Sequence, residues 1–224
     1  MRAMILAAGR GERLRPITDT IPKPLVKVGD KELLVWHLEK LKKAKISEII
    51  MNSAYLSEKI VSFIGDGSKF GLKVTHSVEG EKGLETAGGI IKALPFFENE
   101  TFLVVNGDTF MDADYSQFIE SLDDSISAKL YLVENPPHNQ KGDFSLDENG
   151  NCKRGPGYTF SGAALYNPKS FLGLQVQRMP LLPLFEKWAQ SNSLKAKLFN
   201  GKWFDVGTIE RLNSVNSYIQ NNNL

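Results

Sequence analysis

The sequence contains little that could cross-link the chain or place it in a membrane. It has one cysteine, Cys152, which excludes an internal disulfide framework and a cysteine-based zinc site. No apolar run approaches the roughly 20 residues that a transmembrane helix needs. The formal net charge of +1 excludes a strong overall field toward nucleic acid or anionic membranes. We therefore expect neither of these as a partner.

What remains is an ordinary globular composition. The 224 residues are 42% apolar and 24% charged, and a chain of this length can bury a substantial core without disulfides. The first residues enter an apolar strand at once, which leaves no room for a signal peptide and indicates the cytoplasm. We expect a monomer or a small homo-oligomer.

Strand-like and helix-like segments alternate through the first half of the chain. Apolar runs predict strands at 49–51, 72–75 and 102–105. Apolar residues at helical spacing predict helices between them, including a short one that Thr86 caps and Pro95 ends. This alternation predicts a Rossmann-like α/β fold with a mixed, mainly parallel sheet flanked by helices.

The second half is less regular, and it predicts small antiparallel additions to the sheet. The expected elements are strands at 128–133 and 160–166, a hairpin within 143–154, a helix with Leu181, Leu184, Phe185 and Trp188 on one face, a tight Asn200-Gly201 turn, and a last helix from Thr208. We find neither a repeat nor a linker, so residues 1–224 are expected to form one domain.

The loop after the first strand carries two glycines and a group of cations. Gly9 and Gly11 let backbone N–H groups approach a ligand, and the cations Arg10, Arg13, Arg15 and Lys23 supply charge for phosphates. A P-loop and a Rossmann fingerprint are both excluded, because the required Lys-Ser/Thr and third glycine are missing. The loop predicts a nucleoside triphosphate site; a simple glycine turn with solvated arginines is the alternative.

Two acids follow short apolar strands. Asp108 comes after Gly107 at the end of the most hydrophobic strand, and Asp205 precedes Gly207 and a possible N-cap, Thr208. Ligands of open α/β sheets bind beyond the carboxyl ends of strands, and Mg²⁺ prefers carboxylate oxygens. The pair therefore predicts a shared metal, against the alternative of ordinary turn and helix-start chemistry. Four other acids are expected to be solvated in helix or loop: Asp112, Asp114, Asp123 and Asp124.

The segment 79–89 is too glycine-rich for an ordinary helix start, and it can present backbone amides to a ligand. A surface loop in which Gly88-Gly89 allows close packing is the alternative. The sequence predicts minor roles for the three histidines. We expect His37 to be structural or on the surface, His76 to be a weak ligand candidate, and His138 to be a candidate contact to a second substrate.

The motifs together resemble the sugar-phosphate nucleotidylyltransferases. Residues 6–24 match Leu-Ala-Ala-Gly-x-Gly-x-Arg-Leu-x-Pro-x-Thr…Pro-Lys-Pro, and the Gly-Asp and Trp-x-Asp-x-Gly-Thr segments match the metal motifs of that family. The resemblance implies the nucleotide-diphospho-sugar transferase fold, with residues 1–110 mainly for the nucleotide and 111–224 mainly for the sugar. It implies UTP and a sugar 1-phosphate as substrates and Mg²⁺ as cofactor.

The resemblance also assigns residues. It implies that the nucleotide phosphates are bound by Ala8, Gly9, Gly11, Glu12, Arg13 and Lys23, and the base and ribose by Glu79, Gly80 and Glu85. It implies that the sugar is bound by Asn106, Asp143 and Gly162, and the metal by Asp108 and Asp205. Arg13, Lys23, Asp108 and Asp205 are the expected catalytic residues. The sugar phosphate attacks the α-phosphorus in line, so positioning and charge neutralisation replace a general base.

One segment departs from many hexose-1-phosphate relatives. The Glu-Lys-Pro segment whose lysine holds the sugar phosphate is absent, and residues 136–144 stand in its place. Gly142-Asp143-Phe144 and the segment 159–162 resemble a short bacterial subgroup that uridylylates N-acetylmuramate 1-phosphate in cell-wall recycling. The alternatives are glucose- or mannose-1-phosphate nucleotidylyltransferase, a cytidylyltransferase for a phosphoester such as phosphocholine, and an inactive nucleotide-sugar-binding regulatory subunit.

Overall fold

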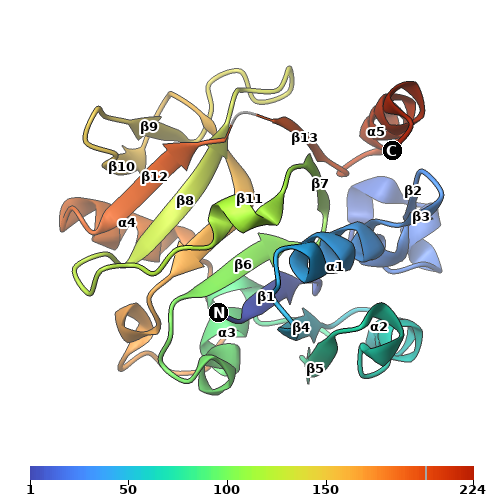
Figure 1. The fold of residues 1–224 in the computed structure, drawn as a ribbon, viewed down its shortest axis with the longest axis horizontal. Helices are drawn as coiled ribbons and strands as arrows, with labels where there is room; N and C mark the ends of the chain where they lie inside the picture. Colours follow the sequence, from blue (N-terminus) through green and yellow to red (C-terminus); the bar gives the residue numbers. More distant parts are fainter. Residues whose placement is uncertain (200) are drawn as a thin grey trace. The chain divides into compact units, whose positions relative to one another are not determined.

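The computed structural model describes residues 1–199 and 201–224 (Figure 1). The chain divides into two compact units. Unit 1 contains Met1–Arg2, Leu84–Val105 and Phe118–Gly201; unit 2 contains Ala3–Gly83, Asn106–Gln117 and Lys202–Leu224. The chain therefore enters each unit more than once. Asn200 of the expected Asn200-Gly201 turn lies outside the described residues.

Unit 2 contains three parallel strands of the seven-stranded main sheet. Strand β4 (Glu48–Ser53) pairs in parallel with both β1 (Ala3–Leu6) and β5 (Lys73–Val78). Helices α1 (Leu33–Lys43) and α2 (Ser57–Ile64) connect them. The remaining elements of this unit are β2 (Lys27–Val28) with β3 (Lys31–Glu32), β7 (Thr109–Asp112) with β13 (Lys202–Asp205), both antiparallel, and α5 (Ile209–Asn222).

An apolar cluster in unit 2 holds α1 and α5 against β7 and the loop after β1. Trp36 on α1 packs edge-on against Phe110 of β7, with ring centroids 5.2 Å apart, and its Nε1 donates to the Val28 carbonyl oxygen at 2.8 Å. Leu14 of the loop and Val206 beyond β13 are fully buried in the same cluster. Burial of these side chains fixes the two segments that carry the candidate site residues.

Unit 1 contains the other four strands of the main sheet in the order β12-β8-β11-β6. Strand β8 (Ala128–Val133) is parallel to β12 (Leu194–Leu198), and β11 (Thr159–Tyr166) is antiparallel to β8 and to β6 (Phe102–Asn106). The unit is completed by α3 (Glu85–Ala93), α4 (Leu182–Gln190) and the hairpin of β9 (Phe144–Leu146) and β10 (Cys152–Arg154).

These elements confirm the expected fold class: a mixed, mainly parallel sheet with helices and small antiparallel additions. The amphipathic face from Leu181 to Trp188 is buried as expected, and Thr208 caps α5 by accepting a hydrogen bond from the Arg211 amide at 3.3 Å. Across the described residues, none of the helices is long and apolar enough to cross a membrane.

The expected cap of α3 is wrong. Thr86 lies inside the helix, whose N-cap position is Leu84 without a side-chain cap. The first-turn amides of Ala87 and Gly88 instead donate to the Met179 carbonyl oxygen, at 3.0 and 3.2 Å. The first-turn amides thus donate to a distant backbone segment, whereas the sequence predicted that the Thr86 hydroxyl would accept from them.

Candidate active site

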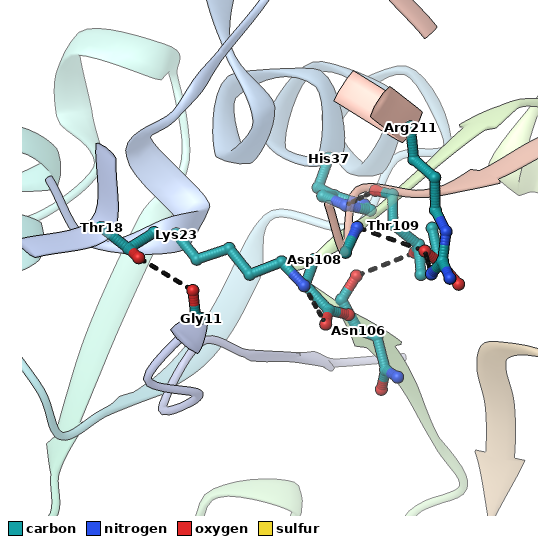
Figure 2. Close-up of polar contacts among 10 residues, drawn as sticks. Gly11, Thr18, Lys23, His37, Asn106, Asp108, Thr109 and Arg211 are labelled. Atoms are coloured by element: carbon teal, nitrogen blue, oxygen red, sulfur yellow. Dashed lines mark hydrogen bonds and ion pairs between the residues drawn. The ribbon is translucent and has the colours of Figure 1, made fainter. Parts of the chain in front are cut away.

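The loop after β1 is open at its first glycine and packed at its second. A Cβ at Gly9 would meet no described atom within 4 Å. Gly11 has a φ of 71°, and a Cβ there would lie 3.0 Å from Cβ of Lys23 and 3.1 Å from Cγ2 of Thr18. The Thr18 hydroxyl donates to the Gly11 carbonyl oxygen at 2.8 Å (Figure 2). Gly11 therefore makes room for the Lys23 stem, while Gly9 leaves room for a ligand.

The three arginines of this loop have different surroundings. Arg10 and Arg15 both pair with Asp19, at 3.3 and 2.8 Å, and the Arg10 guanidinium lies 3.6 Å from the centre of the Tyr55 ring. Arg13 is exposed, and its side chain has neither an ion pair nor a hydrogen bond to any described residue. Arg10 and Arg15 thus hold the loop, and Arg13 is available to a phosphate.

Lys23 reaches Asp108 with a buried stem. Lys23 lies between Pro22 and Pro24 and is the first residue of the 3-10 turn Lys23–Leu25. Its side chain is 8% exposed. Its Nζ donates to Oδ2 of Asp108 at 2.7 Å, and that carboxylate is 44% exposed (Figure 2). Gly107 permits this turn because a Cβ there would lie 2.9 Å from the Leu6 carbonyl oxygen. The pair joins the loop after β1 to the turn that precedes β7.

Asp205 and Asp108 are brought together by the pairing of β7 with β13. Asp205 is opposite Thr109 in the antiparallel register, and the Val206 amide donates to the Asp108 carbonyl oxygen at 3.0 Å. Two acids that are distant in the sequence are therefore backbone neighbours, as the shared-metal expectation requires.

Sequence reasoning missed Arg211. From the first turn of α5, its Nη1 donates to Oδ1 of Asp205, which also accepts from the Gly207 amide at 3.2 Å. A cation in the first turn of a helix interacts unfavourably with the positive end of the helix macrodipole. This unfavourable position was the only feature of the sequence that indicated an anion near Arg211. Each of the two acids thus has its own cation, Lys23 for Asp108 and Arg211 for Asp205.

The donor set fits Mg²⁺. Asp108 and Asp205 offer partly exposed carboxylate oxygens, and no group of three or more His, Cys, Asp or Glu residues that could hold a metal occurs among the described residues. A cation here would take most of its ligands from water and phosphate, which is how Mg²⁺ is commonly bound beside nucleotides. The chemistry of these residues is therefore compatible with Mg²⁺.

A buried histidine supports β7, the strand that directly follows Asp108 and pairs with the strand of Asp205. His37 Nε2 lies 2.7 Å from the Thr109 carbonyl oxygen, and Nδ1 lies 2.8 Å from the Tyr115 hydroxyl. Because a carbonyl only accepts, Nε2 carries the proton and Nδ1 accepts from Tyr115. Burial, the largest cause, lowers the pKa of His37 to about 4, so the ring is neutral near pH 7. The expected structural role of His37 fits these contacts.

The four other acids are mostly solvated. Asp114, Asp123 and Asp124 are exposed as expected. Asp112 is a correction: it ends strand β7 rather than lying in helix or loop, and it accepts from the Tyr218 hydroxyl at 2.6 Å. This bond raises the pKa of Tyr218 to about 12, because ionisation would place two anions together.

Glu79 and Gly80 of the expected base site have contrasting surroundings. Glu79 is 5% exposed and accepts from Nδ2 of Asn52 at 2.8 Å, while Oδ1 of Asn52 accepts from the Ala7 amide at 2.8 Å. Asn52, which sequence reasoning missed, thus links this segment to the loop after β1. A Cβ at Gly80 would meet nothing within 4 Å among the described residues, so a ligand can approach its backbone.

In unit 1, Glu85 and Gly88 have structural partners. Glu85 has a φ of 58° and pairs with Arg178 at 2.8 Å. A Cβ at Gly88 would lie 2.1 Å from the Gln177 carbonyl oxygen. The close-packing explanation therefore accounts for this glycine.

Two of the expected sugar residues, Asp143 and Gly162, occupy a loop and an irregularity of β11, and the third, Asn106, ends β6. Asp143 accepts from the Phe160 amide at 2.9 Å and from Nδ2 of Asn139 at 3.1 Å. Gly162 has a φ of 85° at an irregularity of β11, so it needs the freedom of glycine. In unit 2, the Asn106 carbonyl oxygen accepts from the Thr109 hydroxyl at 3.0 Å, near Asp108 (Figure 2).

Comparison with known proteins agrees with these motifs. The sequence pattern described as "Nucleotidyl transferase" matches residues 2–154. A Neisseria meningitidis serogroup B protein named N-acetylmuramate alpha-1-phosphate uridylyltransferase is 47% identical over 95% of this chain and 95% of its own. The UTP–glucose-1-phosphate uridylyltransferase of Synechocystis is 34% identical over 67% of this chain and 42% of its own. The structure of HddC from Yersinia pseudotuberculosis matches with a TM-score of 0.81 at 26% identity, covering 97% of this chain and 99% of that one.

Proposed function

Because the chain belongs to the nucleotidyl transferase family, we propose that it transfers the uridylyl group of UTP to N-acetylmuramate 1-phosphate and releases pyrophosphate. The observation that carries this proposal is the 47% identity to the Neisseria protein over 95% of both chains. The segment around Gly142-Asp143, where a Glu-Lys-Pro sequence is absent, supports the same sugar. Such a reaction would serve the recycling of cell-wall sugars.

In this proposal, the loop after β1 holds the β- and γ-phosphates of UTP. The backbone from Ala8 to Glu12 borders the open position at Gly9, and Arg13 supplies an uncommitted guanidinium. Lys23 serves the α-phosphate, because its ammonium has three N–H donors and needs only one for Asp108. Glu79 and Gly80 contact the base and ribose.

Asp108 and Asp205 hold Mg²⁺, which supplies positive charge for phosphate oxygens when it is bound. The acceptor phosphate is ionised near neutral pH, so no side chain has to remove a proton from it. An oxygen of this phosphate forms the new bond to the α-phosphorus, and the bond to pyrophosphate breaks. The residues of the site position two anions and offset their charge.

On the sugar side, unit 1 contributes Asp143 and Gly162. Asp143 already accepts two hydrogen bonds, but a carboxylate has about four acceptor positions and can receive sugar hydroxyls as well. Its contacts also keep the loop beside β11 in one conformation.

A panel of substrates tests the proposal. UTP, CTP, GTP and dTTP are each combined with N-acetylmuramate 1-phosphate, glucose 1-phosphate, mannose 1-phosphate and phosphocholine, and pyrophosphate release is measured with Mg²⁺ and with EDTA. We expect the fastest release from UTP with N-acetylmuramate 1-phosphate, and loss of release in EDTA. A faster reaction with another pair reassigns the substrates, and no release from any pair contradicts enzymatic activity.

A further inference from the structure

Three polar atoms converge on one point above Gly207. A Cβ at this glycine would lie 2.9 Å from Nη1 of Arg211, 2.9 Å from Oδ1 of Asp205 and 3.2 Å from Nη2 of Arg13. The two arginines come from the loop after β1 and from α5, and both belong to unit 2. Figure 2 shows the Arg211 side chain extending from its helix toward Thr109 and Asp108. Glycine at this position leaves the space free for the two guanidinium groups.

The charges at this point are unbalanced. Asp205 offsets Arg211, but Arg13 has no ion pair with any described residue. Two guanidinium groups beside a single carboxylate repel each other unless a further anion lies nearby. Guanidinium forks match phosphate oxygens in geometry as well as charge, and Arg211 has five N–H donors, of which the bond to Asp205 uses one.

We propose that Arg211 is a second phosphate-binding residue, which acts with Arg13 on the pyrophosphate portion of the nucleoside triphosphate. This inference rests on the proposed function and adds a specific residue to it. Arg211 keeps Asp205 in place through one N–H and presents its other donors to the β- and γ-phosphates. Gly207 leaves room for both guanidinium groups on the same side of the turn.

The competing role for Arg211 is purely to orient and neutralise Asp205. The two roles predict different affinities for phosphate ligands when no metal is present, because Asp205 then has no metal ion to bind. They also differ in the charge-balanced variant Arg211→Met/Asp205→Asn, which removes both partners of the ion pair and leaves the net charge unchanged.

The experiment measures the affinity of the full chain for UTP and for inorganic pyrophosphate in EDTA by calorimetry. The proteins are the wild type, Arg211→Met, Arg211→Lys and the double variant. Arg2→Met is the matched control, because Arg2 also pairs with an acid, Glu98, and its side chain is 20% exposed against 21% for Arg211. Thermal melting checks that each variant is folded, and the Mg²⁺ affinity of each is measured separately.

We expect Arg211→Met and the double variant to bind both ligands about 10- to 100-fold more weakly, as for loss of hydrogen bonds to a charged group, with Arg211→Lys between them and the wild type. Arg2→Met should match the wild type. Recovery of wild-type affinity in the double variant overturns the inference, since Arg211 then only offsets Asp205. Undetectable binding by the wild type also overturns it. Pyrophosphate release by the wild type with N-acetylmuramate 1-phosphate separately reports whether the proposed function holds.

Discussion

The two candidate metal-binding acids of unit 2 and Asp143 of unit 1 are held in different ways. Asp108 and Asp205 are paired with cationic side chains, Lys23 and Arg211. Asp143 accepts from a backbone amide and an amide side chain, both neutral donors. A carboxylate paired with a cation can exchange that partner for a metal ion, whereas one bonded to backbone fixes the conformation of the chain. The first region is thus suited to handling charge and the second to defining shape.

The largest effect should come from Asp108→Asn. Loss of this charge removes half of the proposed metal ligands, so turnover should fall by about 100-fold or more while the fold persists. Steady-state pyrophosphate release and circular dichroism measure the two quantities. Asp114→Asn is the matched control, because Asp114 is an exposed acid of the same unit. Near-normal turnover of Asp108→Asn would remove it as a metal ligand.

Lys23→Ala should have the next largest effect. It removes the cation proposed for the α-phosphate, so kcat should fall by about 100-fold with the order of sugar preference unchanged. The exposed Lys27→Ala is the control. An unchanged rate together with an altered choice of sugar would refute the phosphate role and would erase the distinction between the two regions.

Asp143→Asn tests the proposed sugar-binding role of unit 1. One carboxylate oxygen becomes an amide nitrogen, so a hydrogen bond to the loop or to the sugar is lost. We expect KM for the sugar 1-phosphate to rise about 10-fold, as for loss of one hydrogen bond to a charged group, with KM for UTP unchanged. Asp147→Asn, at the β9–β10 turn, is the control. A rise in KM for UTP instead would show that this loop does not act on the sugar alone.

The smallest effect concerns the stability of β7, the strand that directly follows Asp108. His37 is buried and neutral, with its pKa lowered from 6.5 to about 4. As the pH falls from 6.5 toward 4, His37 therefore binds a proton in the unfolded chain but not in the folded chain. Stability is complete above pH 6.5 and is lost through this window, by about 2 kcal/mol between pH 7 and pH 4.5.

Urea unfolding of the wild type and of His37→Gln at these two pH values measures the contribution. The variant should be less stable at pH 7 but should lose about 2 kcal/mol less on acidification. Equal losses in both proteins would show that His37 is not held neutral. Unit 1 offers no equivalent, because its single histidine, His138, is exposed.

Much of the architecture follows from local patterns in the sequence. Alternating apolar runs predicted the strands and helices, the glycine turn predicted the β9–β10 hairpin, and Thr208 was identified as the cap of α5. The candidate acids were also found locally, although Asp205 is the last residue of β13 rather than following it, whereas Asp108 comes after β6. Such features depend on residues a few positions apart, whose preferences act through backbone geometry and side-chain periodicity.

Folding decides which charges meet. The sequence alone could not show that Arg10 and Arg15 share Asp19 while Arg13 stays available, nor that Met179 caps α3 from a distance. It could not show that β7 pairs with β13, which places Asp205 beside Asp108 and brings Arg211 to it. Coulombic and hydrogen-bond energies depend on separation in space, and for these pairs that separation is set by strand register and core packing rather than by spacing along the chain.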